Sequence, residues 1–355
     1  MPKMEILKTH FFCLRKRRIA FLFAFSLISQ FNASAQIISV QDSILAFTDS
    51  TFELFKNYSL YAEKINWEKR KKDFLKRNSQ LPHFKEIFPA FQTILDDLGD
   101  HHSFFWYNNT KYSSRYGQLD ASQIRKPLMD ALENGHATLT VDVIDSVGYI
   151  RIPPNNSPDD FNEMQKSAQE IQDSICTIYS NSIKGWIIDL RLNTGGNMYP
   201  MIAGIQSFLK PGTFASTVDR NDSLKDWAVD RKAIYEGNKK ITELKENCLP
   251  VLSSAKTVVL ISQVTGSSGE ITALAFINRP NTYFIGEKTA GFMTSNELFR
   301  LPFNTFLLLT SAYETDSNGK IISFIQPDKE MVDGDDFDTI GNDLKVLEAF
   351  KWINK

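Results

Sequence analysis

The sequence predicts an α/β fold, in which a core of alternating strands and helices is preceded by a small N-terminal helical domain. In the larger C-terminal part, short apolar runs typical of buried strands alternate with segments whose apolar residues recur every three or four positions. In the N-terminal part only the helical spacing is found. Alternation of this kind requires crossover connections within one core. We therefore expect a helical domain at 36–112, a connector at 113–140 and an α/β domain at 141–355.

The first 35 residues have the pattern of an export signal. A basic stretch that ends in Arg15-Lys16-Arg17-Arg18 precedes the apolar run "IAFLFAFSLI" and then "ASAQ". This order is typical of a secretory signal peptide, here cleaved after Ala35. An uncleaved membrane anchor is the alternative, but the apolar run is shorter than the roughly 20 residues that span a bilayer. We expect a periplasmic or secreted protein that contacts the membrane only through an uncleaved signal.

Charge and cysteine content limit the partners. The chain has 40 Lys and Arg residues against 42 Asp and Glu, and six of the basic residues lie in the predicted signal. The mature chain is therefore acidic, and nucleic acid is not expected as a partner because phosphate binding needs a basic face. Two cysteines, Cys176 and Cys248, follow the cleavage site. Export would permit a disulfide, but Cys176 lies in a helical pattern and we expect two free, buried thiols.

Two apolar stripes define the helical domain. Their residues are spaced three and four apart, as on one face of a helix: Phe52, Phe55, Tyr58, Tyr61, Ala62 and Ile65, and then Phe84, Ile87, Phe88, Phe91, Ile94, Leu95 and Leu98. Gly99 is expected to end the second of these helices.

The α/β domain begins with a hairpin around Asp145-Ser146, which separates two alternating runs. The segments that follow are a helix (161–178), a strand ("GWIIDLRL"), a helix (202–209), a strand ("TVVLISQ"), a helix ("EITALAFI") and two strands ("TYFIGE" and "TFLLLTSAYE"). The polar, Lys- and Glu-rich stretch 210–250 is interpreted as an excursion over the surface.

A serine-rich turn is the first candidate for chemistry. In "SQVTGSSGEITALAF", residues 262–276, Ser267 and Ser268 lie between a buried strand and a helix. A serine in this position is exposed at the end of the strand, and the positive end of the helix dipole stabilises a developing oxyanion. The alternative is a capping role, with Ser267 and Glu270 forming a Ser-x-x-Glu capping box.

The positions of the histidines exclude one class of hydrolase. His83, His101, His102 and His136 all precede the serine turn. The α/β-hydrolases order their triad as serine, acid and then histidine, so this class is not expected.

A glycine pair is the second candidate. Gly195-Gly196 in "DLRLNTGG" follow a buried strand and precede a helix, so their backbone N–H groups can approach a ligand closely. The segment lacks the lysine of a phosphate-binding loop and the spacing of a dinucleotide fingerprint. An oxyanion donor opposite the serine turn fits better, and a simple turn at a strand end is the alternative.

Four segments, taken in order, resemble the signatures of the tail-specific, or C-terminal processing, serine peptidase family. They are "GWIIDLRLNTGGN", "TVVLISQVTGSSGEITALAF", "YFIGEKTAGF" and "IQPD". In addition, "LGDHHS" resembles the helical-domain motif that carries a histidine in the tricorn-like branch. The resemblance implies a crotonase- or ClpP-like spiral αβ core and an exported serine endopeptidase. The spacing between "HHSFFW" and "VDVID" is too short for the PDZ domain of many relatives.

The resemblance also implies roles for individual residues. Ser267 corresponds to the nucleophile, and the oxyanion donors would be the N–H groups of Ser268 and of Gly195 or Gly196. His102 corresponds to the histidine of the tricorn-like branch and is the candidate general base, with Ser103 as an orienting hydroxyl. A cluster of histidines at a helix end without a catalytic role is the alternative, and a metal site is not expected because adjacent side chains diverge.

The sequence departs from the family pattern at two places. Phe292 occupies the position of the lysine base of the processing peptidases, and Lys288, inside the same motif, is more typical of solvated surface. The acidic residue of the tricorn-like branch is missing before "QPD", and neither Asp316 nor Asp328 matches it.

Two alternatives to a peptidase remain, and each would use the same cleft. The first is a catalytically silent binding protein for an apolar ligand or a peptide, as the retinoid-binding relatives suggest, and the second is an esterase. Arg191 or Arg300 could bind a substrate carboxylate, although Arg191 is better placed to anchor the turn at its strand end. We expect a peptide or protein substrate, no cofactor and no metal.

Overall fold

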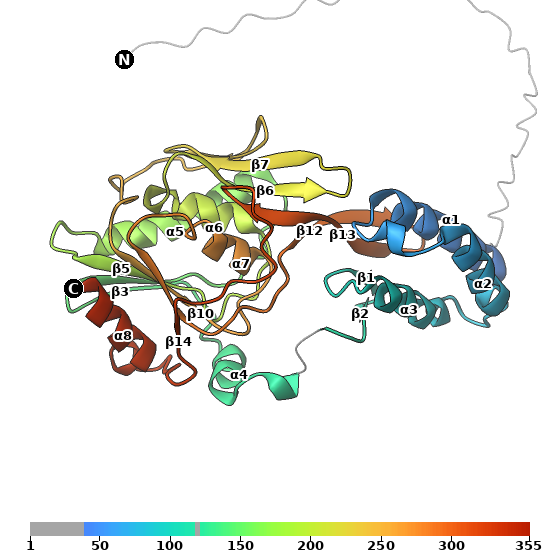
Figure 1. Cartoon of the computed structure of the whole chain (residues 1–355), viewed down its shortest axis with the longest axis horizontal. Helices are drawn as coiled ribbons and strands as arrows, with labels where there is room; N and C mark the ends of the chain where they lie inside the picture. Colours follow the sequence, from blue (N-terminus) through green and yellow to red (C-terminus); the bar gives the residue numbers. More distant parts are fainter. Residues whose placement is uncertain (1–38, 118–120) are drawn as a thin grey trace, which may run out of the picture. The chain divides into compact units, whose positions relative to one another are not determined.

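The computed structural model describes residues 39–117 and 121–355. The predicted signal peptide lies outside the described residues. Residues 39–355 form one compact unit, built from two sheets and the helices around them (Figure 1). Within this described part of the chain, no helix combines the length and the apolar character needed to cross a membrane.

A six-stranded sheet forms the centre of the C-terminal part. Its order is β14-β11-β10-β5-β4-β3, and all neighbours are parallel except the β3–β4 hairpin. The strands are β3 (Thr140–Ile144), β4 (Val147–Arg151), β5 (Gly185–Asp189), β10 (Thr257–Ile261), β11 (Thr282–Gly286) and β14 (Lys329–Glu330). Every residue of β4, β5 and β10 is buried, as expected for parallel strands that are covered on both faces.

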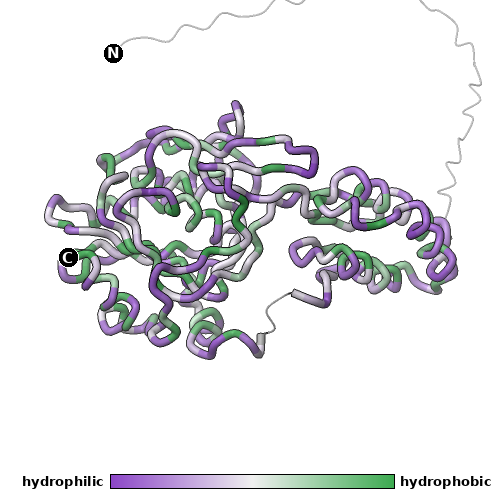
Figure 2. The backbone as a smooth tube through the Cα atoms, in the orientation of Figure 1, coloured by the Kyte–Doolittle hydropathy of each residue, from purple (hydrophilic) through white to green (hydrophobic). Residues whose placement is uncertain are grey.

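Helices cover both faces of this sheet. One face packs against α5 (Phe161–Ile178), α6 (Met198–Gly204) and α7 (Ser268–Leu274). The other face packs against α8 (Leu344–Ile353). In Figure 2 the apolar segments of the chain gather in these central strands and helices, while many of the outer loops are hydrophilic. The predicted α/β core with crossover helices is confirmed.

A second sheet of eight strands joins the N-terminal helices to this core. Its order is β2-β1-β13-β6-β7-β8-β9, and β12 also pairs with β13. The strands are β1 (Phe104–Tyr107), β2 (Thr110–Ser113), β6 (Gly212–Asp219), β7 (Leu224–Val229), β8 (Ala233–Glu236), β9 (Lys239–Glu243), β12 (Thr294–Leu301) and β13 (Thr305–Asp316). The stretch 210–250 therefore contains four strands. The sequence did not predict them, because much of β7 and β9 is exposed and carries polar residues.

Strand β13 connects the two parts of the molecule. Its first half pairs with β1, through Phe306 to Leu308, and its second half pairs with β6, through Ala312 to Asp316. The helices α1 (Val40–Tyr58), α2 (Trp67–Asn78) and α3 (Phe88–Leu98) bury an aromatic cluster against this end of the sheet. The predicted connector at 113–140 contains the helix α4 (Lys126–Glu133). The three domain boundaries stay predictions.

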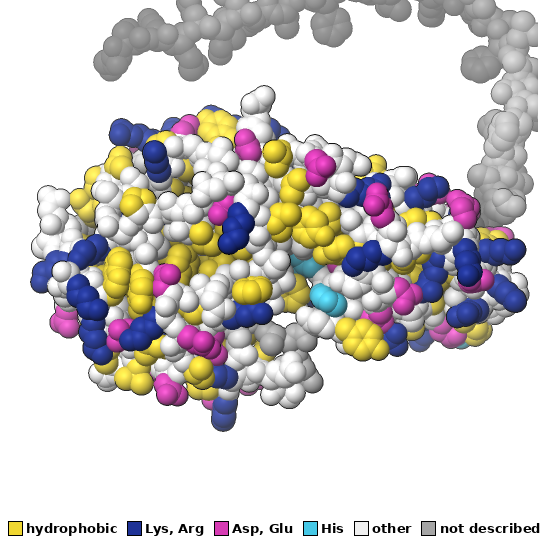
Figure 3. All heavy atoms as spheres, in the orientation of Figure 1, with side chains coloured by type: hydrophobic (Ala, Val, Ile, Leu, Met, Phe, Trp, Pro, Cys, Tyr) yellow, Lys and Arg dark blue, Asp and Glu magenta, His cyan; other side chains and the backbone are white. Residues whose placement is uncertain are grey.

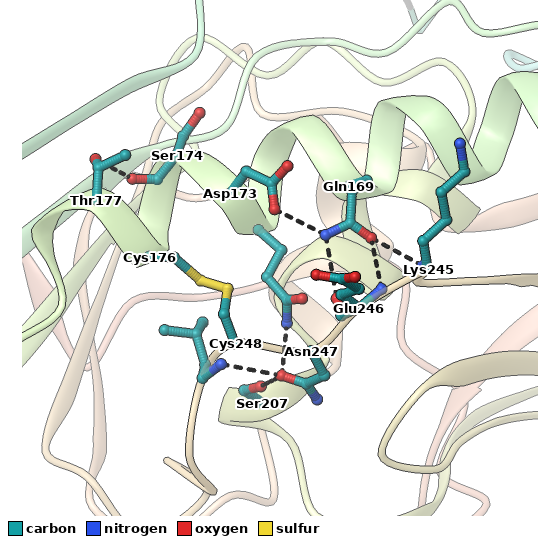
Figure 4. Close-up of a disulfide and its surroundings, with 12 residues drawn as sticks. Gln169, Asp173, Ser174, Cys176, Thr177, Ser207, Lys245, Glu246, Asn247 and Cys248 are labelled. Atoms are coloured by element: carbon teal, nitrogen blue, oxygen red, sulfur yellow. Dashed lines mark hydrogen bonds between the residues drawn. A yellow bond between two sulfur atoms is a disulfide. The ribbon is translucent and has the colours of Figure 1, made fainter.

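The two cysteines form a disulfide, so the prediction of free thiols was wrong. Cys176 of α5 is bonded to Cys248, with their Cα atoms 6.3 Å apart (Figure 4). The segment after β9 lies along α5, because the Gln169 side chain accepts the backbone N–H groups of Lys245 and Glu246 at 2.8 and 3.2 Å. This packing brings together the thiols of two cysteines that are 72 positions apart, and the local sequence carries no signal for it.

Candidate active site

The predicted nucleophile lies in a tight turn between β10 and α7. Ser267 directly precedes α7, with φ 51° and ψ −123°. An L-residue in this region is strained, and such strain persists only where the surroundings hold it in place. Strained residues of this kind are concentrated at functional sites. The conformation therefore supports a special role for Ser267 beyond that of a cap.

A buried carboxylate holds this turn. Glu270 accepts the backbone N–H of Ser267 at 2.9 Å, as half of a capping box, but three further donors also reach it. These are the Thr289 hydroxyl at 2.5 Å and the N–H groups of Gly291 and Phe292 at 2.9 and 2.7 Å. Burial raises the pKa of Glu270, while the four hydrogen bonds oppose that shift. Glu270 thus fixes the serine turn and the segment 289–292 to each other.

The glycine pair packs directly against the serine turn. A Cβ atom on Gly195 would lie 3.0 Å from the Cβ of Ser267, and one on Gly196 would lie 1.9 Å from the carbonyl oxygen of Asn155. The Gly195 N–H is already used, since it donates to the Asn193 side chain at 3.0 Å. Gly196 is exposed, and its carbonyl accepts the Ser268 hydroxyl at 2.6 Å. Of the two glycines, only Gly196 therefore retains an N–H without an acceptor among the described residues.

The loop that carries the predicted base is fixed by Asp100. Its carboxylate accepts the backbone N–H groups of His102 and Ser103 at 3.2 and 3.0 Å and the Ser103 hydroxyl at 2.6 Å. Thr310 of β13 also donates to it, at 2.9 Å. The Ser103 side chain is buried and bonded within this group, so it holds the loop on β13, and among the described residues no hydrogen bond joins it to the imidazole of His102.

The His102 ring has two partners from outside the helical part. Its Nδ1 lies 2.9 Å from the hydroxyl of Thr294 on β12, and its ring centroid is 5.2 Å from that of Phe292. Burial, together with the nearby Lys111 ammonium, lowers the pKa of His102 to about 4. The imidazole is therefore neutral at pH 7, which is the form that can accept a proton. His101, in contrast, is exposed.

Phe292 occupies the position at which the processing peptidases have a lysine base. It is anchored by its N–H on Glu270 and packs on the imidazole of His102. Lys288 points elsewhere, with its ammonium 3.9 Å from the centroid of the Phe324 ring. Neither residue supplies an amine to the serine turn.

The two aspartates considered from the sequence have structural contacts of their own. Asp316 accepts the N–H groups of Asn318 and Lys320 in a turn, and Asp328 accepts the N–H of Phe284 at 2.8 Å. A buried acid does line the cleft, but it is Glu314 on β13, for which the sequence carries no signal.

The candidate catalytic groups line one cleft of about 520 Å³. Ser267, Ser268, Gly196 and His102 all line it, together with Thr294. No hydrogen bond joins His102 to Ser267 within the described structure, and catalytic contacts are often loose before a substrate binds. The cleft thus combines a strained serine, a neutral imidazole and free backbone donors, which is the set that acyl transfer requires.

Arg191 does not reach this cleft. It is fully buried and bonded to Asp189, Asp335 and Asp343 behind the strand ends, as the anchoring role predicts. Arg300 lies over the Phe306 ring. Over the described ranges there is also no group of three or more His, Cys, Asp or Glu side chains that could hold a metal ion.

Thr294 and Glu314 are two residues of the cleft that the sequence did not reveal. Thr294 lies 192 positions from His102, and its neighbours in "GFMTSN" carry no catalytic signal. Glu314 lies within the run of β13, and its position there is that of an ordinary strand residue. The pairing of β12 with β13 places Thr294 opposite Tyr313, and the pairing of β13 with β6 places Glu314 opposite Thr217; both side chains line the cleft.

Comparison with known proteins gives a family match over most of this core. A sequence model of peptidase family S41 matches residues 146–331. A nisin-resistance protein of Lactococcus lactis subsp. lactis is 27% identical over 262 residues, which are 74% of each chain. A carboxyl-terminal-processing protease of Picosynechococcus is 29% identical over 173 residues. That match covers 48% of this chain and only 35% of the relative.

Solved structures share the fold at lower identity. A lipoprotein of Streptococcus agalactiae has a TM-score of 0.67 at 22% identity, over 89% of this chain and 96% of that one. The photosystem II D1 C-terminal processing protease has a TM-score of 0.52 at 15% identity, over 83% and 93% of the two chains. Both similarities extend beyond the region matched by the family model and include the helical part of the fold.

Proposed function

The chain belongs to peptidase family S41, and we propose that it is an exported serine endopeptidase in which Ser267 is the nucleophile and His102 the general base. The observation that carries this proposal is the strained Ser267 turn, packed against the glycine pair, in one cleft with a neutral imidazole. Family membership supports hydrolysis of peptide bonds and peptide or protein substrates.

The proposed reaction follows from these groups. The Ser267 hydroxyl attacks the peptide carbonyl while the Nε2 of His102 accepts its proton. The N–H groups of Gly196 and Ser268 stabilise the oxyanion of the tetrahedral intermediate. His102 then returns the proton to the leaving amine, and water repeats the sequence on the acyl-enzyme. The Thr294 hydroxyl at Nδ1 holds the ring so that Nε2 is free for this exchange.

Among the described residues no carboxylate bonds to the imidazole of His102, and this has a chemical consequence. An acid at Nδ1 would stabilise the imidazolium that forms during attack, whereas Thr294 offers a neutral hydroxyl. Phe292 adds apolar surface against the same ring. We therefore propose a slow peptidase whose base stays neutral down to acidic pH.

The nature of the substrate is a further part of the proposal. The name of the Lactococcus relative refers to resistance against nisin, and its similarity extends over 74% of both chains. This favours peptides rather than folded proteins as substrates. Parallel assays with peptide and simple ester substrates separate this function from that of an esterase.

Export is proposed on two grounds. The basic, apolar and Ala-x-Ala order of the first 35 residues is typical of a signal peptide. The disulfide between Cys176 and Cys248 is the kind of bond that persists in oxidising compartments. Mass spectrometry of the protein purified from the cell envelope or medium tests this, and an N-terminus other than Gln36 would contradict the predicted cleavage.

Labelling with a fluorophosphonate probe tests the active site directly. The wild-type protein should react, whereas Ser267→Ala should not and His102→Ala should react far more slowly. Undiminished labelling of Ser267→Ala would move the nucleophile elsewhere. Absence of labelling in the wild type, with a copurified apolar ligand, would favour the binding protein.

A further inference from the structure

Glu314 is a buried carboxyl without a partner. It lies on β13 in the wall of the cleft that contains Ser267, and it is only 4% exposed. Neither of its carboxyl oxygens accepts or donates a hydrogen bond within the described part of the chain, and Oε2 is closed off from solvent. Burial of an unpaired polar group costs free energy. Such a residue needs an explanation, and a bound group that supplies the missing partner is one.

An indole lies on the same face of the sheet. Asp316 is directly opposite Ala215, which is opposite Trp227 of β7. Residues in register point to the same face, and Glu314 lies two positions from Asp316, so it shares that face. Trp227 is itself buried and lines the cleft. The two side chains therefore form one wall that combines a carboxyl with a tryptophan.

The charge of the cleft has one sign. Its acidic lining residues are Asp159 and Glu314, and neither Lys nor Arg contributes to it. Tyr199, also in the lining, lies close to Asp159 and to Glu236, and burial together with these two carboxylates raises the pKa of its phenol. On the face shown in Figure 3, by contrast, basic and acidic side chains are interspersed. The cleft thus has no basic side chain to pair with Glu314.

We propose that Glu314 and Trp227 form a specificity subsite that receives a cationic side chain, lysine or arginine, of a peptide bound in the cleft. The subsite rests on the proposed function in that it requires a peptide beside Ser267. The bound ammonium or guanidinium supplies the missing hydrogen-bond donors to the carboxylate. Tryptophan provides the strongest cation–π surface among the side chains.

The state of Glu314 changes with binding. Burial, and the carboxylate of Glu270, hold the pKa of Glu314 well above its usual range, which favours the neutral carboxylic acid while the subsite is empty. When the cation enters, the acid releases its proton to solvent and an ion pair remains. The substrate therefore brings its charge into the subsite and forms the ion pair there. The subsite selects cations through this pairing rather than through long-range attraction.

Binding to an inactivated enzyme tests this subsite without hydrolysis. In the Ser267→Ala background, affinities are measured by fluorescence anisotropy for labelled alanine-based peptides that have lysine, glutamine or norleucine at one position. Norleucine keeps the alkyl stem of lysine and lacks its charge. We expect the lysine peptide to bind at least about 10-fold more tightly than the norleucine peptide at the position that reaches the subsite.

Glu314→Gln in the same background should reduce this preference to less than about 3-fold. The matched control is Asp159→Asn, which removes one negative charge from an exposed position of the same cleft and should leave most of the preference intact. Thermal melting verifies that each variant is folded. If Glu314→Gln does not fold, Trp227→Phe provides the second test, with an expected loss of about 2- to 5-fold.

Equal affinity for lysine and norleucine at every position would overturn the proposal, and so would a lysine preference that survives Glu314→Gln. Preference for the glutamine peptide would also contradict it, because the neutral acid would then be the recognising form. A lysine preference without fluorophosphonate labelling would uphold the subsite and refute the peptidase. Labelling without the preference would do the reverse.

Discussion

At the scale of single residues, the site depends on a few contacts that each have one chemical task. Ser267 is strained, Glu270 holds it, and Thr294 orients the imidazole of His102. The local sequence around Ser267 was sufficient to predict its position, because a turn between a strand and a helix is set by neighbouring residues. The partners of His102 were not predictable, because Thr294 and Phe292 lie at or just before the start of β12, almost two hundred positions away.

Replacing Ser267 by alanine should lower peptide hydrolysis by about 10⁴-fold or more, since the nucleophile itself is removed. Ser295→Ala is the matched control: this serine also lines the cleft but has no proposed role, and at least half of the activity should remain. Hydrolysis of a fluorogenic peptide by the two variants measures the difference. Equal losses in both variants would show that general disturbance of the cleft, and not loss of the nucleophile, explains the effect.

The pH dependence of kcat/KM should reflect the neutral imidazole. Burial lowers the pKa of His102 to about 4, and only its neutral form accepts a proton. Activity should therefore be retained as the pH falls through 6 and should be lost only as it approaches about 4. A decline centred near 6.5, the ordinary value for histidine, would show that the ring is open to solvent in the active enzyme.

Phe292→Ala should move this decline upward. The substitution removes the apolar ring that packs on His102, lets water reach the imidazole and raises its pKa toward the ordinary value. The midpoint of the acidic limb is the quantity to compare with that of the wild type. An unchanged midpoint would mean that Phe292 contributes nothing to the burial that sets this pKa.

At the scale of elements, the strand-end turns carry the chemistry and neighbouring strands supply the constraints. The glycine pair and the serine turn both follow buried parallel strands, β5 and β10, which are direct neighbours in the sheet. Ligands of parallel sheets bind beyond these carboxyl ends. The apolar runs of both strands made this juxtaposition predictable. The four strands at 210–250 were missed because their polar, half-exposed faces lack the expected alternation.

Gly196→Ala should reduce kcat by about 10²- to 10³-fold, the usual effect of removing one oxyanion donor. The added Cβ would lie 1.9 Å from the carbonyl oxygen of Asn155, so the backbone must shift and its N–H loses its position. Gly341→Ala provides a control at which the nearest atom is 3.8 Å away. Comparison of kcat for the two variants tests the assignment, and a kcat close to that of the wild type for Gly196→Ala would remove Gly196 from the oxyanion site.

At the scale of the whole molecule, the disulfide ties the outer segment after β9 to the core helix α5. Sequence could not predict the pairing, because the contact depends on how four intervening strands fold back. The bond closes a loop of 72 residues, and native bonds of this kind contribute about 2–5 kcal/mol to the free energy of unfolding.

Reduction should therefore lower the melting temperature. Thermal unfolding with and without dithiothreitol measures the effect on the wild-type protein. The Cys176→Ser, Cys248→Ser double variant should melt near the reduced wild type and should not respond to the reductant. A response in that variant would assign the change to the reagent and not to the bond.

The long strand β13 contacts the loop that carries His102 and also forms part of the cleft wall. Through Thr310 it anchors the loop of His102, through Glu314 it provides a wall of the cleft, and it pairs with β1 at one end and β6 at the other. The residues that position the base and those that select the substrate therefore depend on the same strand, β13. Evolution of a new preference on this ribbon would have to preserve the placement of the base, which restricts the substitutions that can broaden the range of peptides without loss of turnover.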